Sequence, residues 1–333
     1  MKNKVAVWFF WTILLTLLLL AAGLFSLSVG SSGVGFRDVF STFGGGMGAV
    51  ERSIIFDIRL PRILMGFAVG GSLSLAGVIL QGMFRNPLVE PYTLGISGGA
   101  ALGVALNIVF RISHHFGILS LPVSGFLGAA AVSFLVYFLG VKKGTLRTDS
   151  FLLTGVMISF VSSSLMMFLM ALARSEDLHG IIFWMMGSLE EPNRLLLQSE
   201  LIVAVLGLLA SYLFVFDLNA FGLGEEEALH LGVNTERSKR ILFILAAVLT
   251  GFAVSVAGII GFVGLVVPHF VRMFLGGDHR ILLIGSFLSG AIFLILCDAL
   301  ARTVIAPLEL PVGVITGILG GTLFVYAVSK KRI

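Results

Sequence analysis

The sequence has little charge and almost no cysteine. Only 12% of its 333 residues are charged and 57% are hydrophobic, whereas ordinary soluble domains carry roughly 25% charged residues. A soluble fold cannot bury that much apolar surface, so the composition excludes a water-soluble protein and predicts a polytopic α-helical membrane protein. The single cysteine, Cys297, excludes an internal disulfide, and the sequence shows no Cys/His cluster of the kind that binds zinc or an iron–sulfur cluster.

Patterns that carry catalysis are missing too. No GxxxxGK[ST] motif occurs in the sequence, so the chain has no phosphate-binding loop with which to hold ATP. No Ser/His/Asp or paired-carboxylate arrangement indicates an active site, and the adjacent His114 and His115 lack a carboxylate at metal-ligand spacing. We therefore predict no enzyme activity, no bound cofactor and no metal. The net charge of +4 is attributed to basic cytoplasmic loops rather than to nucleic-acid binding.

Ten stretches are apolar enough to cross a bilayer, which takes about 20 residues at a rise of about 1.5 Å each. They lie at about 5–29, 56–82, 93–110, 119–141, 149–172, 194–216, 240–258, 261–275, 280–304 and 312–329. The uncharged run 241–271 is interrupted by four helix breakers, so we predict a span followed by a shorter return helix: Gly258, Gly261, Gly264 and Pro268. No polar stretch is long enough for a second domain, so residues 1–333 are predicted to form one membrane domain.

Ten spans place both termini on the same side of the membrane, and the basic residues indicate which side. If the termini are cytoplasmic, every lysine falls inside, as the positive-inside rule expects: Lys2, Lys4, Lys142, Lys143, Lys239, Lys330 and Lys331. Several arginines fall outside and need another explanation: Arg37, Arg52, Arg59, Arg62, Arg111, Arg174, Arg194 and Arg302.

The predicted inner segment at about 217–240 contains a short helix signal. Gly224 followed by three glutamates is typical of a helix start, because acids favour the positive end of the helix dipole, and Gly232 is typical of a helix end. A short helix on the cytoplasmic face would offer apolar side chains to a partner's groove: Ala228, Leu229 and Leu231. The alternative interpretation is a solvated connecting loop.

Two pairs of charged residues lie near the predicted outer ends of spans. Arg59 and Arg62 could form bidentate contacts with an acidic protein surface, or they could extend to the membrane interface with Asp57 as a local ion-pair partner. Asp298 and Arg302 are four residues apart on one helical face, so they could serve function or simply satisfy each other.

Small residues recur at every fourth position of the last span, at Gly313, Gly317 and Gly321. Such a ridge lets helix backbones approach closely, or it leaves room for a passage along the helix. Both interpretations stay open from the sequence alone.

Several stretches occur together in the order typical of one family. The first contains Arg59-Leu-Pro-Arg62, Gly77, Gln81 and Arg85-Asn-Pro-Leu-Val-Glu-Pro-Tyr-Thr-Leu-Gly; the others are Leu223-Gly-Glu-Glu through Leu231-Gly-Val, Gly258 through Arg272, and Leu310-Pro-Val-Gly313. In these stretches the chain resembles the FecCD permeases of ABC importers for iron–siderophore complexes, haem and cobalamin. The resemblance covers nearly the whole chain.

The resemblance implies a type II ABC importer permease fold with ten spans and both termini cytoplasmic, in the bacterial inner membrane. It further implies a second permease copy or a paralogue, two cytoplasmic ABC ATPase subunits that bind ATP and Mg²⁺, and an extracytoplasmic binding protein. The residues implied to couple to the ATPases are Gly224, Glu225, Glu226, Ala228, Leu231, Gly232 and Val233. The residues implied to dock the binding protein are Arg59, Arg62 and Arg302, and those implied to line the pathway are Gly313 and Gly317.

The implied function is ATP-driven import of a ferric siderophore by alternating access, with haem or cobalamin as alternative cargo. A different class of protein, an ion-driven secondary transporter, would use a buried acid as its relay: Asp298, Glu200 or Asp149. A membrane scaffold or receptor without transport activity is a further alternative. The coupling segment and the absence of a visible inverted repeat favour the importer.

Overall fold

The structure is a computed structural model, and it describes residues 2–30, 48–117, 119–142, 145–146, 148–190 and 193–330. The longer helices are α1 (Lys2–Ser28), α4 (Leu60–Phe84), α5 (Ile96–Val109), α7 (Ser120–Gly140), α8 (Thr148–Leu172), α9 (Ser175–Met186), α10 (Arg194–Leu213), α13 (Thr235–Ala257), α14 (Val263–Leu275), α15 (His279–Ala301) and α16 (Val312–Ser329). The shorter elements are α3 (Ala49–Ser53), the π-helix η2 (Ile54–Arg59), the 3₁₀-helix η3 (Pro91–Leu94), α6 (Ile112–Phe116), α11 (Val215–Leu223), α12 (Glu225–His230), and the strands β1 (Val141–Lys142) and β2 (Thr145–Leu146).

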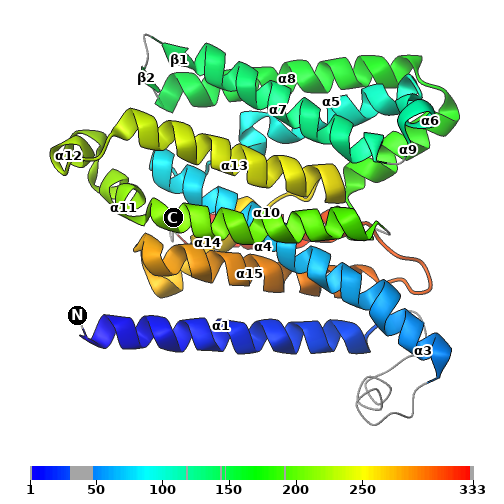
Figure 1. Cartoon of the computed structure of the whole chain (residues 1–333), viewed down its shortest axis with the longest axis horizontal. Coiled ribbons are helices and arrows are strands. Elements are labelled where there is room, and N and C mark those ends of the chain that lie inside the picture. Colours follow the sequence, from blue (N-terminus) through cyan, green and yellow to red (C-terminus); the bar gives the residue numbers. More distant parts are fainter. Residues whose placement is uncertain are drawn as a thin grey trace.

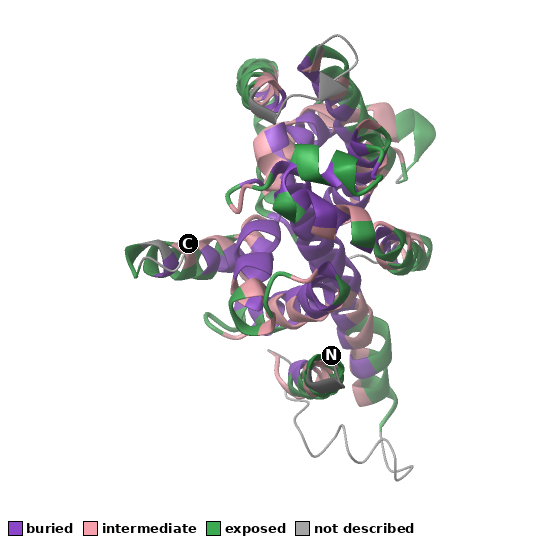
Figure 2. Ribbon diagram, turned by 90° about the vertical axis from the view of Figure 1, so that its left-hand side faces the viewer, coloured by how far each residue is buried: buried purple, intermediate pink, exposed green. Residues whose placement is uncertain are grey.

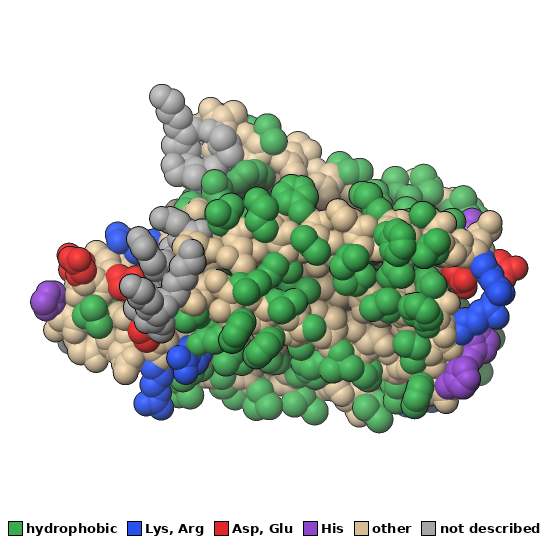
Figure 3. Space-filling view, turned by 90° about the horizontal axis from the view of Figure 1, so that it is seen from above, with side chains coloured by type: hydrophobic (Ala, Val, Ile, Leu, Met, Phe, Trp, Pro, Cys, Tyr) green, Lys and Arg blue, Asp and Glu red, His purple; other side chains and the backbone are tan. Residues whose placement is uncertain are grey.

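The long helices run side by side along the long axis of the molecule (Figure 1). In the face seen in Figure 3, hydrophobic side chains cover the middle, and charged and histidine side chains gather at the two ends. That distribution is typical of a protein whose middle lies in lipid and whose ends lie in water.

In the described part of the chain, seven helices are long and apolar enough to cross a membrane by length and composition. They are α1, α7, α8, α10, α13, α15 and the continuous helix 49–84, of which α4 is the larger part. Three shorter apolar helices accompany them: α5, α14 and α16. Each of the ten predicted segments coincides with one of these helices, so the all-helical membrane fold is confirmed. The N-terminal end of α1 and the C-terminal end of α16 lie at the same end of the molecule as α12 (Figures 1 and 2). The count of ten full spans and the cytoplasmic placement of that end stay predictions.

Helix α4 is the centre of the molecule. It contacts α10, α13, α14 and α15, and Figure 2 shows the buried residues concentrated along the middle of the bundle. Glycines allow these helices to approach closely: a Cβ added at Gly70 would lie 2.4 Å from the Gly290 oxygen, and one added at Gly77 would lie 1.9 Å from the Gly264 oxygen. Neither position can carry a larger side chain unless the backbones move apart.

The predicted interruption of the run 241–271 is confirmed, but not all of its predicted causes are. Helix α13 ends at Ala257, and α14 begins at Val263. Gly258 allows the break because it has φ +71° and because an added Cβ would meet the Trp184 oxygen at 2.2 Å. The predicted roles of Gly264 and Pro268 as breakers are wrong, since both lie inside α14.

Several short elements have no counterpart among the predicted spans. The π-helix η2 precedes α4, and α9 lies in a region expected to be a loop between spans. The strands β1 and β2 form a small hairpin in which Val141 pairs with Leu146. These elements depend on contacts with the rest of the fold, which hydropathy does not report.

Candidate functional site

The predicted cytoplasmic helix exists as α12, with the predicted start and end. Gly224 is its N-cap and has φ +138°, and the three glutamates occupy its first turn. After the helix, Gly232 has φ +85°; its backbone N–H donates to the Leu229 oxygen at 2.9 Å, and the Val233 N–H donates to the Ala228 oxygen at 3.0 Å. These two bonds form a Schellman motif, which explains the need for glycine at this point.

The same motif decides which predicted coupling residues face outward. Ala228 and Val233 are buried in the hydrophobic core, as expected of the apolar pair that accompanies a Schellman motif. Their side chains therefore pack α12 against the core and are not available to a partner protein, contrary to the prediction for Ala228. Leu229 and Leu231 are 55% and 50% exposed, so these two side chains form the outward apolar surface of the segment.

Polar contacts hold α11 and α12 against the membrane helices. Lys239, which is buried, donates through Nζ to Glu225 Oε2 at 2.6 Å, and the Ser238 hydroxyl donates to the Asp217 carboxylate. Because the partners are 14 and 21 residues apart in sequence, no local pattern could have predicted these anchors.

A third contact links α11 to the start of α15. The Asn219 side chain donates through Nδ2 to Asp278 Oδ1 at 3.1 Å, and its Oδ1 accepts from the backbone N–H of His279 at 2.9 Å. These two bonds fix α11 to α15, and the contacts of Lys239 and Ser238 fix α11 and α12 to α13.

An exposed apolar surface surrounds α12. Leu213, Phe216 and Leu223 are exposed on α10 and α11 beside the leucines of α12, and a pocket extends from Leu213 to Leu231. We call this set the α12 surface: Leu213, Phe216, Leu223, Leu229 and Leu231. An apolar patch on a water-facing end of a membrane protein is a candidate contact surface for another protein.

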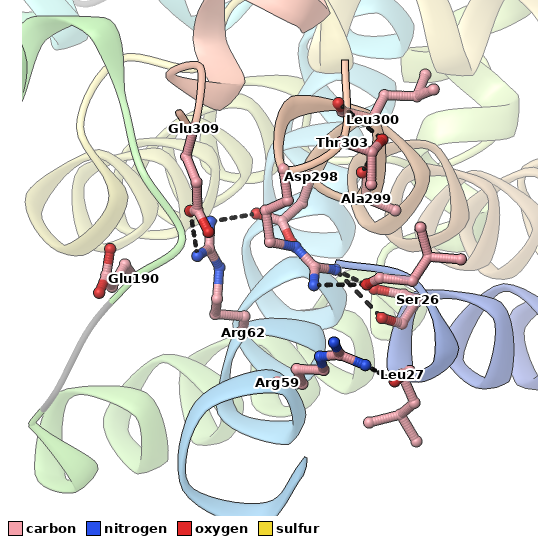
Figure 4. A network of polar contacts seen from close by, with 12 residues as sticks. Ser26, Leu27, Arg59, Arg62, Glu190, Asp298, Ala299, Leu300, Thr303 and Glu309 are labelled. Carbon is pink, nitrogen blue, oxygen red and sulfur yellow. Dashed lines mark hydrogen bonds and ion pairs between the residues drawn. The ribbon is translucent and has the colours of Figure 1, made fainter. Parts of the chain in front are cut away.

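At the opposite end of the molecule, one buried carboxylate joins two arginines (Figure 4). Asp298 Oδ1 accepts from Arg62 Nη2 at 3.0 Å, and Asp298 Oδ2 accepts from Arg302 Nε at 2.9 Å. Asp298 is 2% exposed. The predicted pairing of Asp298 with Arg302 is confirmed, whereas no pattern in the sequence indicates Arg62 as the third member.

Both arginines have further partners. Arg62 Nη1 donates to Glu309 Oε2 at 2.7 Å. Arg302 Nη2 donates to the Ser26 hydroxyl at 2.7 Å, and its Nη1 donates to the Val29 oxygen at 3.1 Å. We call this group the outer arginine network; it joins α1, α4, α15 and the connection between α15 and α16.

Arg59 lies beside this network at the end of η2. Its guanidinium donates to the Leu27 oxygen of α1, and the side chain is buried, like those of Arg62 and Arg302. The three predicted docking residues are thus brought together, but in this structure they face the chain's own acceptors. The predicted local partner of the first two arginines is wrong, because Asp57 pairs with Arg194 at 3.0 Å instead.

Two of the stretches that carry the family resemblance, 59–95 and 258–272, meet at the break between α13 and α14. Tyr92 donates through its hydroxyl to the Ile260 oxygen at 2.8 Å and accepts from the Ile260 N–H at 3.1 Å. Gln81 donates through Nε2 to the oxygens of Gly264 and Leu265 at 3.2 and 3.3 Å. The Tyr92 hydroxyl satisfies both backbone groups of Ile260 in the non-helical break, as such a segment inside a membrane protein requires. Gln81 instead donates to the Gly264 oxygen inside α14, which receives no bond from Pro268 because proline has no N–H.

Glu90 lies next to this junction, in the connection between α4 and η3 and outside the spanning helices. Burial raises the pKa of its carboxyl to about 7. Burial also raises the pKa of the Tyr92 hydroxyl, and the nearby Glu90 charge adds to that effect. Glu90 is therefore the acid of this connection that titrates near neutral pH.

The two predicted pathway glycines have different surroundings. A Cβ added at Gly313 would lie 2.3 Å from the Met186 oxygen and 2.7 Å from the Ile259 oxygen, whereas nothing lies within 4 Å of one added at Gly317. Gly313 is thus a packing position in this structure. Gly317 faces open space, as a pathway-lining residue would.

Of the acids that an ion-driven transporter would use as relays, the structure describes the side chains of Asp298 and Glu200, and these two are not paired with each other. Asp298 is held by two arginines, and Glu200 is buried in α10 facing Ser72. The side chain of Asp149 lies outside the described part of the structure. Across the described ranges no three His, Cys, Asp or Glu side chains gather as metal ligands would.

Comparisons with known proteins agree on one family. The FecCD transport family matches residues 18–330. The hemin transport system permease protein of Yersinia pestis is 40% identical over 96% of this chain and 95% of its own length. The cobalamin import system permease protein of Halobacterium salinarum is 37% identical over 86% and 76%, and the Fe(3+)-citrate import system permease protein of Bacillus subtilis is 35% identical over 92% and 90%.

Solved structures show the same fold. An inward-facing conformation of a metal-chelate type ABC transporter aligns with a TM-score of 0.84 at 32% identity and covers 97% of this chain and 99% of that chain. PsaBC from Streptococcus pneumoniae aligns with a TM-score of 0.57 at 16% identity, covering 84% of this chain and 93% of that chain. At that lower identity the likeness concerns the fold alone.

Proposed function

Because the chain belongs to the FecCD transport family, and is therefore the permease subunit of an ABC importer in the inner membrane, we propose that it carries a ferric siderophore into the cytoplasm by alternating access. The family match over residues 18–330 carries this proposal. ATP hydrolysis belongs to a separate ATPase. Relatives named for hemin, cobalamin and ferric citrate show that the family accepts several bulky metal complexes, and a cargo of this class suits a pathway without fixed ligands.

The ATPase contact is proposed at the α12 surface. Its leucines and phenylalanine are exposed at a polar end of the molecule, where lipid cannot cover them. Leu229 lies on α12 and Leu231 at its C-cap, and one ion pair, between Glu225 and Lys239, fixes this helix to α13. Two ATPase subunits, one for each permease of a dimer, would bind ATP and Mg²⁺. Since this chain has no nucleotide site, the energy for switching must come from ATP binding differently to the two states of the ATPases.

Docking of an extracytoplasmic binding protein is proposed at the outer arginine network. Glu309 is the exposed edge of this network, with its side chain 37% exposed, whereas Asp298 is enclosed. An incoming carboxylate would therefore compete with Glu309 for Arg62 and leave the Asp298 bonds intact. Each such partly exposed pair would contribute about 0–1 kcal/mol, so the contacts would fix orientation more than affinity.

The pathway is proposed to run along α16 at the interface with a second permease, either a copy of this chain or a paralogue. Gly317 supports this placement because nothing within 4 Å faces its Cβ position. Helix α16 also projects from the bundle in Figure 2, which leaves most of its surface for a partner.

The experiment is uptake of radioiron, supplied as several ferric siderophores, in cells that lack this gene and in the same cells after its return. Gene-dependent uptake of one ferric siderophore would support both the transporter class and the cargo. Haem is the second candidate, favoured by the 40% identity to the hemin permease, and it should be measured in parallel with cobalamin. Gene-dependent entry of haem or cobalamin without siderophore uptake would replace the cargo, and no gene-dependent entry of any of them would contradict the importer function.

A further inference from the structure

A groove runs between α7 and α13 on the surface of the bundle. Its α13 wall is formed by Arg240, Phe243, Ile244, Ala247 and Val248, and its α7 wall by Phe126, Ala130, Ser133, Phe134 and Tyr137. Both sets recur every three or four residues, so each is one continuous stripe along its helix. The small side chains of Ala130 and Ala247 leave the hollow, and the larger, exposed Phe134 and Ile244 contribute to its walls.

The two helices are antiparallel, and the groove occupies one end of their contact. Tyr137 stacks on Phe243 at 6.3 Å between ring centroids, and Phe126 packs on Phe252 at 4.7 Å. From Arg240 to Val248 the α13 wall rises about 12 Å, and the α7 wall rises about 16 Å, at 1.5 Å per residue. Half of a hydrocarbon core is about 15 Å, so the groove is as long as one leaflet is deep.

The walls of the groove are apolar along this length. The one hydroxyl along the middle of the groove belongs to Ser133, and it already donates to the Ala129 oxygen of its own helix at 2.8 Å. The groove therefore offers no free hydrogen-bond donor to a polar ligand between its two ends. Its chemistry suits an alkyl chain.

One end of the groove is positively charged. The guanidinium carbon of Arg240 lies 5.8 Å from the centre of the Tyr137 ring, and no carboxylate of the described residues forms an ion pair with Arg240 within 4.0 Å. Arg240 is exposed, directly follows the buried anchor Lys239, and lies in the second turn of α13. The charge thus stands at the α12 end of the bundle, where we place the cytoplasmic leaflet.

The face that carries the groove is turned away from the last helix. Figure 1 shows α7 and α13 on the near side of the molecule, and in Figure 2 the C-terminal helix α16 projects from the opposite side. A second permease that pairs through α16 would leave this groove open to lipid.

From these features we propose that the groove binds one anionic phospholipid of the cytoplasmic leaflet, with an acyl chain between α7 and α13 and the phosphate on Arg240. The apolar length of the groove matches an acyl chain, and the exposed cation at its mouth, which has no carboxylate partner among the described residues, matches an anionic headgroup. The bound lipid would fill the hollow over Ala130 and Ala247 and hold α13, the helix that follows α12, against α7. This site is independent of the cargo.

The test is native mass spectrometry of the full-length protein released from nanodiscs that contain equal amounts of phosphatidylglycerol and phosphatidylcholine. The wild type should retain phosphatidylglycerol in preference to phosphatidylcholine. Arg240→Gln should lower retained phosphatidylglycerol about fivefold, the factor expected for one basic residue at an anionic surface, and should leave phosphatidylcholine unchanged. Arg280→Gln, which removes an exposed arginine at the same end of the molecule, is the matched control and should behave as the wild type does.

A second pair of variants tests the acyl-chain half of the site. Ala247→Phe and Ala130→Phe fill the hollow from opposite walls, so if one fails to fold the other still reports. Either should abolish retention of both lipids, which binding of a free phosphate at Arg240 would not predict. Unchanged phosphatidylglycerol in the Arg240 variant, or an equal loss in the Arg280 variant, would overturn the proposal. Loss of the dimer in the phenylalanine variants would assign the groove to a protein contact instead.

Discussion

Two glycines at the same end of the molecule allow a residue-level test of coupling. Gly232 and Gly276 have φ values of +85° and +84°, and nothing lies within 4 Å of an added Cβ at either one. We predict that Gly232→Arg abolishes uptake and cargo-stimulated ATPase activity of the assembled importer, because it places a charge beside the leucines of the α12 surface. Gly276→Arg should retain both activities.

The pair separates coupling from backbone strain. In each variant the new arginine must adopt a left-handed backbone conformation, which lowers the free energy of unfolding by about 1–2 kcal/mol. Both variants should therefore lose similar thermal stability and reach the membrane in similar amounts. Normal uptake by the Gly232 variant would contradict the α12 assignment. Equal loss of uptake in both variants would show that strain alone explains the defect.

The outer arginine network predicts a large cost for one carboxylate. Asp298→Asn leaves two buried arginines without the charge that they share, and removing one partner of a buried ion pair costs about 3–5 kcal/mol. Asp57→Asn removes an ion pair with the exposed Arg194, which is worth about 0–1 kcal/mol. Thermal unfolding of the two purified variants checks the difference, and equal midpoints would contradict the structural role of Asp298.

Glu90 predicts a pH dependence of stability. Its pKa of about 7 in the folded chain lies above the ordinary value of 4.5, so the folded state binds the proton more tightly than the unfolded state does. Stability from this group is present below about pH 4.5 and is lost as the pH rises to about 7, by at most about 3 kcal/mol. Glu90→Gln should flatten that slope in thermal unfolding measured between pH 5 and 8. An unchanged slope would show that Glu90 titrates normally.

At the scale of elements, the close contact between α4 and α14 is predicted to tolerate no added atom. Gly77→Ala places a methyl group 1.9 Å from the Gly264 oxygen, so the helices must separate at a cost of about 1–3 kcal/mol. Gly317→Ala meets nothing within 4 Å and should be neutral or stabilising by up to about 1 kcal/mol, because alanine favours a helix. Thermal unfolding of both variants measures the contrast. A Gly77 variant as stable as the wild type would exclude a tight α4–α14 contact.

The sequence predicted those elements that depend on local signals. Apolar runs located all ten main helices, Gly258 located the break after α13, and Gly224 and Gly232 located both ends of α12. The sequence missed η2, because a π-helix changes neither the composition nor the hydropathy of the run before α4. It also misjudged Gly264 and Pro268. Pro268 has no N–H to donate to the Gly264 oxygen, and the side chain of Gln81 donates to that oxygen instead, so the helix continues.

The candidate sites were predictable only in part for the same reason. The sequence predicted that Arg59, Arg62 and Arg302 lie at one end of the molecule and the glutamates of α12 at the other, and the structure confirms both positions. Which side chains face outward depends on contacts with the rest of the fold: Ala228 and Val233 are buried in the hydrophobic core, and Arg62 is buried in an ion pair with Asp298. No spacing in the sequence reports that Asp57 lies next to Arg194.

For the whole molecule, the transport class predicts the source of energy. Uptake by intact cells should continue when the proton and sodium gradients are collapsed while ATP is maintained, and it should stop when ATP is depleted with the gradients intact. Of the candidate relay acids, Asp298 is paired with two arginines, whereas Glu200 is buried in α10 and its carboxylate has no hydrogen-bond partner among the described residues, so the energy source is decided by this measurement. Uptake that stops when the gradients collapse would favour a secondary transporter.

The helix 49–84 joins both candidate sites. It contains 36 residues, which gives a length of about 54 Å. Arg62 lies near its outer end, and Arg85 directly follows its inner end, near Gly224 at the start of α12. One continuous element thus connects the outer arginine network with the α12 surface.

The glycine contacts of that element set a limit on how the molecule can change shape. Because α4 touches α14 and α15 through backbone atoms at Gly77 and Gly70, it has no space in which to slide or turn against them. In the alternating-access cycle that we propose, this central group would stay a fixed frame and the peripheral helices would move. Amide hydrogens of α4 should therefore exchange with deuterium more slowly than those of α8 or α16, and at the same rate in every nucleotide state.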